Sequence, residues 1–298
     1  MKVLLTGATG FIGSKLLEND KYEFIKVVRN RALKDGNVFI YAIDGDTNWS
    51  EGVYQADVVI HLAGVAHNKL DSQNDYKSVN YQGSINLANQ AANAGVKRFI
   101  FLSSIAVNGI SNTYPFKYSD KTNAADGYAA SKYEAEEGLK EIAENTGLEV
   151  VIIRPPLVYG KNAPGNFRTL LKLAEANFFL PLGAVNNSRS FVSVDNLVDL
   201  IITCIEHPSA ANQTFLVSDD EDISSSNLLN KLIVFAGKTP SLLPVPVFFL
   251  ELVASMFGKN QVLERFTSSL TIDIEYTKET LNWKPPISLD EGIRRCIR

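Results

Sequence analysis

The first thirteen residues constrain the fold more than any other stretch of this chain. A short apolar run, residues 1–5, leads into a turn with a glycine at every third position: Gly7, Gly10 and Gly13. Glycines at such a turn let the backbone approach an anion closely, and the helix that follows presents its positive end to that anion. The stretch therefore predicts a strand, a tight turn and a helix that together bind a pyrophosphate. Because the spacing is GxxGxxG rather than GxGxxG, an ordinary structural turn is the alternative at this point.

The first half of the chain alternates apolar runs with helical stretches. The runs are apolar throughout instead of alternating with polar residues, which is typical of parallel strands covered by helices on both faces. We therefore expect an α/β fold with a doubly wound parallel sheet, which binds its ligand beyond the carboxyl ends of the strands. The expected strands are residues 1–5, 24–28, 38–43, 57–62, 98–102 and 150–153, and the expected helices are 76–94 and 128–145.

This rhythm changes after residue 154, where a loop rich in Pro, Gly and Asn covers residues 160–165. Asp195 and either Ser224 or Ser225 stand where helix N-caps are expected. The pattern of the second half predicts short strands at 188–194 and 214–217 and helices at 166–176, 195–206 and 225–237. The second half is thus expected to contain fewer strands than the first half and to be less regular.

Composition and charge exclude several classes of function. The 298 residues carry 33 acidic and 29 basic side chains, for a net charge of −4. These charges are mixed along the sequence, so we expect no nucleic acid and no anionic membrane as a partner. Cys204 and Cys296 each stand alone in an apolar run, which predicts buried thiols, no metal site and a reducing cytoplasm. No secretory signal is recognised at residues 1–13, which also favours the cytoplasm.

Residues 245–257 are the most membrane-like stretch of the chain. They are too short to span a bilayer, and they include Pro246 and Glu251. We therefore expect no transmembrane segment. The stretch predicts an amphipathic helix that packs on the protein, with shallow membrane association as the alternative.

Tyr128 and Lys132 form the sharpest chemical pattern in the sequence. Four residues apart on a helix, the phenol and the ammonium lie on the same face. A phenol with a pKa near 10 is a poor acid or base at neutral pH, but a neighbouring cation and the first turn of a helix both stabilise the phenolate. The pattern is suited to proton transfer by the tyrosine, but a lone Tyr-x-x-x-Lys is common and usually indicates surface packing, so its context decides.

Two hydroxyl groups follow the expected strand 98–102. Ser103 and Ser104 stand at its carboxyl end, at the sheet edge where ligands bind. Capping or turn hydrogen bonds are the alternative role for such hydroxyls. Together with the tyrosine and the lysine, they complete a set of groups able to hold and protonate an oxygen atom.

The combined motifs make the chain resemble the extended short-chain dehydrogenase/reductase family, and within it the group of nucleotide-sugar epimerases, dehydratases and reductases. The resemblance covers nearly the whole chain. It rests on the GxxGxxG turn, His61-Leu62-Ala63-Gly64, Asn80, Ser104, Tyr128, Lys132, Arg154-Pro155 and Tyr159-Gly160.

The resemblance implies a Rossmann domain that binds NAD or NADP, formed by residues 1–160 and rejoined by 190–218. It also implies a smaller α+β lobe for the substrate, formed by 161–189 and 219–298. The implied cofactor-binding residues are Gly7, Thr9, Gly10, Phe11, Ile12, Gly13, Arg29, Leu62, Ala63, Gly64, Asn80, Lys132 and Pro155.

The resemblance assigns catalytic roles to three residues. Tyr128 exchanges a proton with a sugar oxygen while hydride moves to or from the nicotinamide. Ser104 hydrogen-bonds the same oxygen, and Lys132 holds the nicotinamide ribose and lowers the pKa of the tyrosine.

Arg189 is the residue that the resemblance places on the substrate pyrophosphate. A guanidinium group suits phosphate oxygens because it donates two parallel hydrogen bonds. A surface salt bridge with a nearby acid is the alternative for this residue. Further expected substrate contacts are Asn166, Phe167 and Arg265.

Two departures from the family pattern bear on the reaction. Arg29 follows the second strand, where a member that prefers NAD carries an acidic residue, so NADP is favoured over NAD. An arginine that faces solvent or stacks on adenine is the alternative. No acidic residue follows Ser104, where sugar 4,6-dehydratases carry them, and this disfavours dehydratase chemistry.

We therefore expect a cytoplasmic oxidoreductase that acts at C4 of a UDP-hexose and forms a homodimer through helices 76–94 and 128–146. Arg29 favours reduction of a UDP-4-keto-6-deoxy-N-acetylhexosamine in polysaccharide biosynthesis. The alternatives are a UDP-glucose or UDP-N-acetylglucosamine 4-epimerase with tightly bound NAD, an NADPH carbonyl reductase of the flavonoid or steroid type, and a cofactor-sensing module without catalysis.

Overall fold

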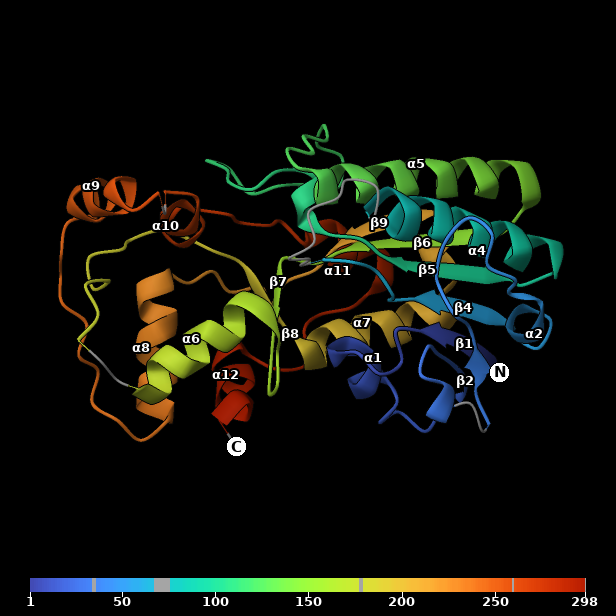
Figure 1. The fold of residues 1–298 in the computed structure, drawn as a ribbon, viewed down its shortest axis with the longest axis horizontal. Coiled ribbons are helices and arrows are strands. Elements are labelled where there is room, and N and C mark those ends of the chain that lie inside the picture. Colours follow the sequence, from blue (N-terminus) through green and yellow to red (C-terminus); the bar gives the residue numbers. More distant parts are fainter. Residues whose placement is uncertain (34–35, 67–75, 177–178, 259, 298) are drawn as a thin grey trace.

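Seven parallel strands form one sheet in the order β3-β2-β1-β4-β5-β6-β9 (Figure 1). The computed structural model describes residues 1–33, 36–66, 76–176, 179–258 and 260–297. The strand order reverses between β1 and β4, and doubly wound sheets bind their ligands at such a switch point. This confirms the expected fold class. The strands are β1 (Lys2–Thr6), β2 (Glu23–Val28), β3 (Val38–Phe39), β4 (Val58–His61), β5 (Arg98–Leu102), β6 (Glu149–Arg154) and β9 (Gln213–Leu216).

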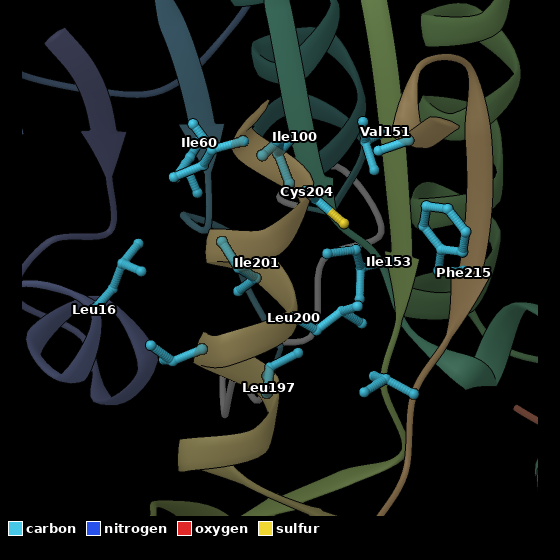
Figure 2. Close-up of a cluster of buried hydrophobic side chains, with 14 of the residues drawn as sticks. Leu16, Ile60, Ile100, Val151, Ile153, Leu197, Leu200, Ile201, Cys204 and Phe215 are labelled. Atoms are coloured by element: carbon cyan, nitrogen blue, oxygen red, sulfur yellow. The ribbon is translucent and has the colours of Figure 1, made fainter. Parts of the chain in front are cut away.

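Each strand supplies two hydrophobic layers, because successive side chains point to opposite faces of the sheet. Leu4 and Val59 lie in the layer under α2 (Ser50–Val53), α4 (Gly83–Asn93) and α5 (Gly127–Thr146). Val3 and Ile60 lie in the other layer, with α1 (Phe11–Leu16) and α7 (Val194–Glu206). Figure 2 shows this second layer, in which the strand residues Ile60, Ile100, Val151 and Ile153 lie beside Leu197, Leu200, Ile201 and Cys204 of α7.

A second, smaller part of the molecule lies beyond the carboxyl ends of the strands (Figure 1). Its two-stranded sheet pairs β7 (Leu157–Tyr159) with β8 (Phe191–Ser193), and the sequence pattern did not predict β7. A third hydrophobic cluster joins these strands to α6 (Gly165–Ala176), α8 (Ser225–Phe235) and α12 (Leu289–Ile297). The remaining helices are α9 (Val247–Met256), α10 (Asn260–Thr267) and α11 (Glu275–Leu281). Short helical turns are η1 (Arg31–Leu33), η3 (Ile105–Val107) and η4 (Pro208–Ala210).

Local details differ from the sequence-based expectations at three places. The N-cap of α7 is Ser193, whose Oγ accepts a hydrogen bond from the Asn196 amide at 3.1 Å, and Asp195 lies within the first turn. Strand β3 ends at Phe39, earlier than expected. The helix expected at 76–94 is divided into a wider π-helical segment, η2 (Tyr76–Gln82), and α4. The expected cap of α8 at Ser224 is confirmed, as are the buried thiols of both cysteines.

Helix α9 packs on the protein only in part. Val247, Leu250 and Ala254 are half-buried, but none of its residues is fully buried, although the helix is almost entirely apolar. Within the described ranges, no helix is both long enough and apolar enough to cross a bilayer.

The turn between β1 and α1 depends on Gly13. A Cβ atom at this position would lie 2.2 Å from the carbonyl oxygen of Gly7 and 2.9 Å from the Cα of Ala8, which are backbone atoms with little freedom to shift. We expect Gly13→Ala to lower the free energy of unfolding in urea by about 1–3 kcal/mol, the usual cost of overpacking. At Gly45 the new Cβ would meet Gln82 at an ordinary 3.7 Å, so Gly45→Ala is the matched control. Equal stability of the two variants would contradict this account of the turn.

Candidate active site

The glycine turn brings the backbone of β1 against the loop that follows β4. Gly7 adopts a φ of +71°, which few other residues tolerate, and a Cβ here would lie 2.9 Å from the amide nitrogen of Ala63. The turn opens α1 at Phe11, whose ring lies 3.1 Å from where a Cβ of Gly160 would stand. The turn thus presents a backbone surface free of side chains at the switch point of the sheet, which fits a dinucleotide pyrophosphate.

Gly64 is where two expected cofactor residues converge. A Cβ at Gly64 would lie 3.0 Å from Oδ1 of Asn80 and 3.3 Å from Nζ of Lys132. The Asn80 amide is fully buried and clasps Val65, accepting from its amide nitrogen at 2.8 Å and donating to its oxygen at 3.0 Å. Residues that lie far apart in the sequence therefore meet here: Gly64 in the loop after β4, Asn80 on η2 and Lys132 on α5. The side chain of Asn80 holds the loop after β4 in place.

A chain of hydrogen bonds through Ser84, His61 and Thr6 fixes the loop after β4. The Ser84 hydroxyl donates to the Asn80 carbonyl at 2.6 Å, so it accepts from Nε2 of His61 at 3.0 Å. Nδ1 of His61 then accepts from the Thr6 hydroxyl at 2.7 Å, and Thr6 accepts from the Ala63 amide at 3.2 Å. Burial, with a smaller contribution from the charge of Lys132, lowers the pKa of His61 to about 3. His61 is therefore a neutral structural residue with one defined tautomer.

Ser104 and Tyr128 are in contact at the carboxyl end of β5. Ser104 lies close enough to the phenol to lower its pKa, and Ser104 Oγ accepts from the Ala106 amide at 3.2 Å as the cap of η3. The capping role is thus observed, and the expected contact of Ser104 with a substrate oxygen stays a prediction. Asp126 caps α5 and places Tyr128 in its first turn. Burial raises the pKa of Tyr128 above its usual value near 10, and Ser104 offsets part of that rise.

Lys132 lies one helical turn beyond the tyrosine and is buried. Its ammonium donates to the Leu102 carbonyl at 2.9 Å and lies 4.5 Å from the centre of the Phe101 ring. Burial lowers the pKa of Lys132 to about 8, and the charge of Glu136 opposes this. The expected lowering of the Tyr128 pKa by Lys132 is not found in this structure, because the ammonium is turned to a carbonyl of β5 and burial dominates the phenol.

A buried ion pair beneath these residues was missed by the sequence analysis. The guanidinium of Arg154 contacts both carboxylate oxygens of Glu136, with Nε at 2.9 Å from Oε1, and its NH1 group donates to Asn108 at 3.0 Å. The Ser103 hydroxyl also donates to this carboxylate. Glu136 follows Lys132 by one turn on an otherwise apolar face of α5, and this pattern was the available signal. The pair locks α5 against β5 and β6.

Pro155 and Arg29 occupy different settings at the sheet edge. Pro155 is buried beside the ion pair, and its carbonyl accepts from the Ile105 amide at 2.9 Å, which joins β6 to the segment after Ser104. Arg29 is exposed directly after β2. Its position at the carboxyl end of β2 matches the expected place beside an adenosine ribose.

Arg189, the residue expected to contact a phosphate, has no carboxylate partner in the part of the chain that the structure describes. Its NH1 group donates to the carbonyls of Arg265 and Ser268, both at 2.9 Å, at the end of α10. Burial lowers the pKa of this guanidinium. The alternative of a surface salt bridge is therefore wrong for the described contacts, since the hydrogen-bond partners of Arg189 are carbonyl oxygens. The remaining guanidinium nitrogens suit an anion.

The other expected substrate residues are dispersed. Phe167 is fully buried and packs on Tyr159, with ring centres 5.4 Å apart, so its side chain belongs to the core. Asn166 is exposed at the start of α6, and the Arg265 side chain is exposed on α10. Within the described part of the chain, no three His, Cys, Asp or Glu side chains are grouped to hold a metal ion.

Comparison with known proteins identifies the family. The model of the NAD dependent epimerase/dehydratase family matches residues 3–218. The chain belongs to this family. Membership confirms the resemblance inferred from the motifs and makes the protein an enzyme that uses a nicotinamide cofactor.

Individual family members are similar over the whole chain. A UDP-glucose 4-epimerase of Vibrio cholerae is 42% identical, over 99% of this chain and 94% of that protein. The structure of UDP-glucuronic acid 4-epimerase from Bacillus cereus in complex with NAD matches with a TM-score of 0.78, at 22% identity, over 99% of this chain and 97% of that one. RMD from Pseudomonas aeruginosa, solved with NADPH, matches with a TM-score of 0.77, at 18% identity and the same coverage. Of these two structures, one was solved with NAD and the other with NADPH.

The burial of Lys132 predicts that its charge lowers the stability of the folded protein while being required for activity. Because the pKa falls from 10.5 to about 8 on folding, the charged lysine costs roughly 3 kcal/mol below pH 8. We expect Lys132→Met to abolish activity yet raise the free energy of unfolding at pH 7 by about 2 kcal/mol, since the lost hydrogen bond offsets part of the gain.

The sign of this effect depends on pH. Between pH 8 and 10.5 the unfolded lysine still holds its proton while the folded lysine has lost it, so the wild type becomes more stable as pH rises. The advantage of Lys132→Met should therefore shrink to less than about 1 kcal/mol at pH 10. Lys140→Met, at an exposed position of the same helix, is the control and should show no such dependence. A gain independent of pH would show that the lysine is not buried as a cation.

Proposed function

We propose that this protein is an NAD-dependent UDP-hexose 4-epimerase of the UDP-glucose type. The observation that carries the proposal is that Tyr128 lies beside Ser104, and that Lys132, one helical turn further along α5, lies against the loop at Gly64 beside the glycine turn. Arg189, on the substrate side, adds a cation suited to a diphosphate. The 42% identity with the Vibrio cholerae UDP-glucose 4-epimerase, over nearly both full chains, supports the same reaction.

The residues divide the work of such a reaction between them. A bound nicotinamide supplies the hydride chemistry at C4. Tyr128 holds its proton at neutral pH because burial raises its pKa, so it serves as the donor when the C4 oxygen is protonated. Its action as a base requires added positive charge, and Lys132, one turn away, is a source of that charge. Ser104 lies beside the phenol and would hydrogen-bond the same substrate oxygen.

The first expectation, a 4-keto reductase using NADPH, has no specific support from the relatives. The Vibrio cholerae and Bacillus cereus proteins are both named as 4-epimerases, and the latter was solved with NAD. The expectation rested on Arg29, which is exposed, and on the resemblance of residues 162–167 and 190–196 to bacterial polysaccharide enzymes. We therefore propose NAD as the resident cofactor, with Arg29 facing solvent or the adenine.

Three further proposals follow the family pattern. Residues 1–160 with 190–218 would bind the cofactor, and residues 161–189 with 219–298 would bind the nucleotide sugar.

A homodimer would pair α4 and α5 of two protomers, which lie together on one face of the sheet (Figure 1). A cytoplasmic location suits the two free buried thiols. Light scattering tests the dimer, since a monomer at micromolar concentration would exclude it.

The reaction is tested with UDP-glucose and no added cofactor. We expect the purified protein to form UDP-galactose and to release NAD on denaturation. Tyr128→Phe should lower kcat by about 10²–10⁴ with little change in KM, because it removes the proton donor and leaves the shape of the ring. Tyr133→Phe, five residues further along α5, is the matched control and should keep full activity. Activity that requires NADPH and a 4-keto sugar would overturn the proposal in favour of the reductase.

The role of Arg189 is tested by binding. We expect Arg189→Met to raise KM for UDP-glucose roughly 10- to 100-fold, the range of one or two charge-assisted hydrogen bonds, while kcat falls much less. Arg294→Met, at an exposed site on α12, is the control. Calorimetric titration with UDP should show the same loss of affinity. An unchanged KM would place the substrate diphosphate elsewhere.

A further inference from the structure

Helix α9 is apolar and exposed at the same time. Over residues 239–258 the only charged side chain is Glu251. Seven large apolar side chains of this segment are nevertheless exposed, up to 77% for Met256 and 72% for Phe257, and six of them lie on α9 or directly after it. Helices that are apolar nearly all round are normally buried in a core or in lipid. We call this exposed set the α9 surface: Phe248, Phe249, Leu252, Val253, Met256 and Phe257.

The α9 surface consists of two neighbouring stripes. Residues 248, 252 and 256 form one stripe at a spacing of four, and residues 249, 253 and 257 form the next. Polar side chains occupy only the narrow sector of Glu251 and Ser255. The other apolar residues of the helix, Val247, Leu250 and Ala254, are half-buried against the protein. The two stripes therefore form one wide apolar side of α9, which suits a helix that lies in an interface.

One stripe borders an apolar groove that leads toward the substrate side of the enzyme. The groove has a volume of about 600 Å³, and its lining includes Phe249, Val253, Phe257 and Leu263. Leu263 belongs to α10, the helix whose final carbonyls accept the hydrogen bonds of Arg189. Figure 1 shows α9 and α10 side by side at the end of the molecule far from α2 and β2. The groove and the expected phosphate contact thus share one short helix.

The size of α9 decides between the possible occupants. Ten residues make a helix about 15 Å long. A stable protein interface draws about 20–30 residues from each partner, whereas the α9 surface has six, so it is too small to hold a second copy of the chain by itself. It is also too short to span a bilayer. A short helix of this kind is instead the right size to lie in the boundary between lipid headgroups and acyl chains.

We propose that the α9 surface docks the enzyme on a lipid bilayer, with α9 lying in the plane of the interface. The apolar side chains bury among the acyl chains, and Glu251 and Ser255 face the headgroups. Because residues 239–258 contain no basic side chain, the attraction is apolar and not electrostatic. Docking would bring the α10 end of the substrate side next to the membrane. The proposal does not depend on the epimerase reaction.

Vesicle sedimentation tests the docking directly. We expect the full-length protein to sediment with neutral phosphatidylcholine vesicles, and the bound fraction to change less than twofold between 0.1 and 1 M salt or when anionic lipid is added. Phe248→Asp combined with Leu252→Asp should lower the partition coefficient at least tenfold and leave epimerase activity in solution unchanged. Tyr54→Asp, which alters an exposed tyrosine at the far end of the molecule, is the control and should bind as the wild type does.

A fluorescent reporter distinguishes lipid from protein as the occupant. The native Trp49 and Trp283 are buried, so Met256→Trp adds one exposed indole. Its emission should shift to the blue with vesicles and be quenched by lipids brominated on the acyl chains, whereas Tyr54→Trp should show neither effect. Absence of binding to vesicles would overturn the proposal. So would a blue shift without vesicles that grows with protein concentration, because it would identify a second copy of the chain as the occupant.

Discussion

Two buried charges on α5 organise the centre of this enzyme. Lys132 and Glu136 lie one turn apart on a face of the helix that is otherwise apolar, and neither side chain is accessible to solvent. Glu136 is balanced by Arg154, so its burial is tolerated because partners satisfy the carboxylate. Lys132 has only a backbone carbonyl and an aromatic ring, so its charge remains costly. The structure accepts this cost where a cation is needed beside the phenol and the cofactor.

The rest of the site is arranged around this helix. The loop after β4 must pass close to Lys132, which requires Gly64, and Asn80 and His61 hold that loop by hydrogen bonds that are fully paired. The loop in turn meets the glycine turn at Gly7. Strand β6 is tied to α5 through Arg154. Each of these contacts joins segments far apart in the sequence, and together they set the position of Tyr128 relative to the switch point of the sheet.

The sequence predicted those features that depend on local chemistry. Some signals lie within a few residues of each other: glycines at a tight turn, a tyrosine and lysine at helical spacing, and uniformly apolar strands. The fold and the candidate catalytic residues could therefore be predicted from the sequence. Features that depend on tertiary partners could not. The Glu136–Arg154 pair, the core position of Phe167 and the carbonyl partners of Arg189 all require knowledge of which segments meet. The NADP preference stays a prediction, since it rested on Arg29 alone and, within the part of the chain that the structure describes, the side chain of Arg29 makes no contact that tests it. Helix α9 was expected to pack because it is apolar, and only the structure shows that one of its apolar sides stays exposed.

The proposed 4-epimerase reaction removes hydride from C4 of the sugar and returns it to the same carbon within one enzyme-bound cycle. UDP-glucose carrying deuterium at C4 tests this most directly, with the product and the recovered substrate examined by mass spectrometry. The account predicts that UDP-galactose forms and that the deuterium stays at C4 in both sugars, because the hydride never exchanges with water. Loss of the label to solvent, or failure to form the galacto epimer from this substrate, would contradict it.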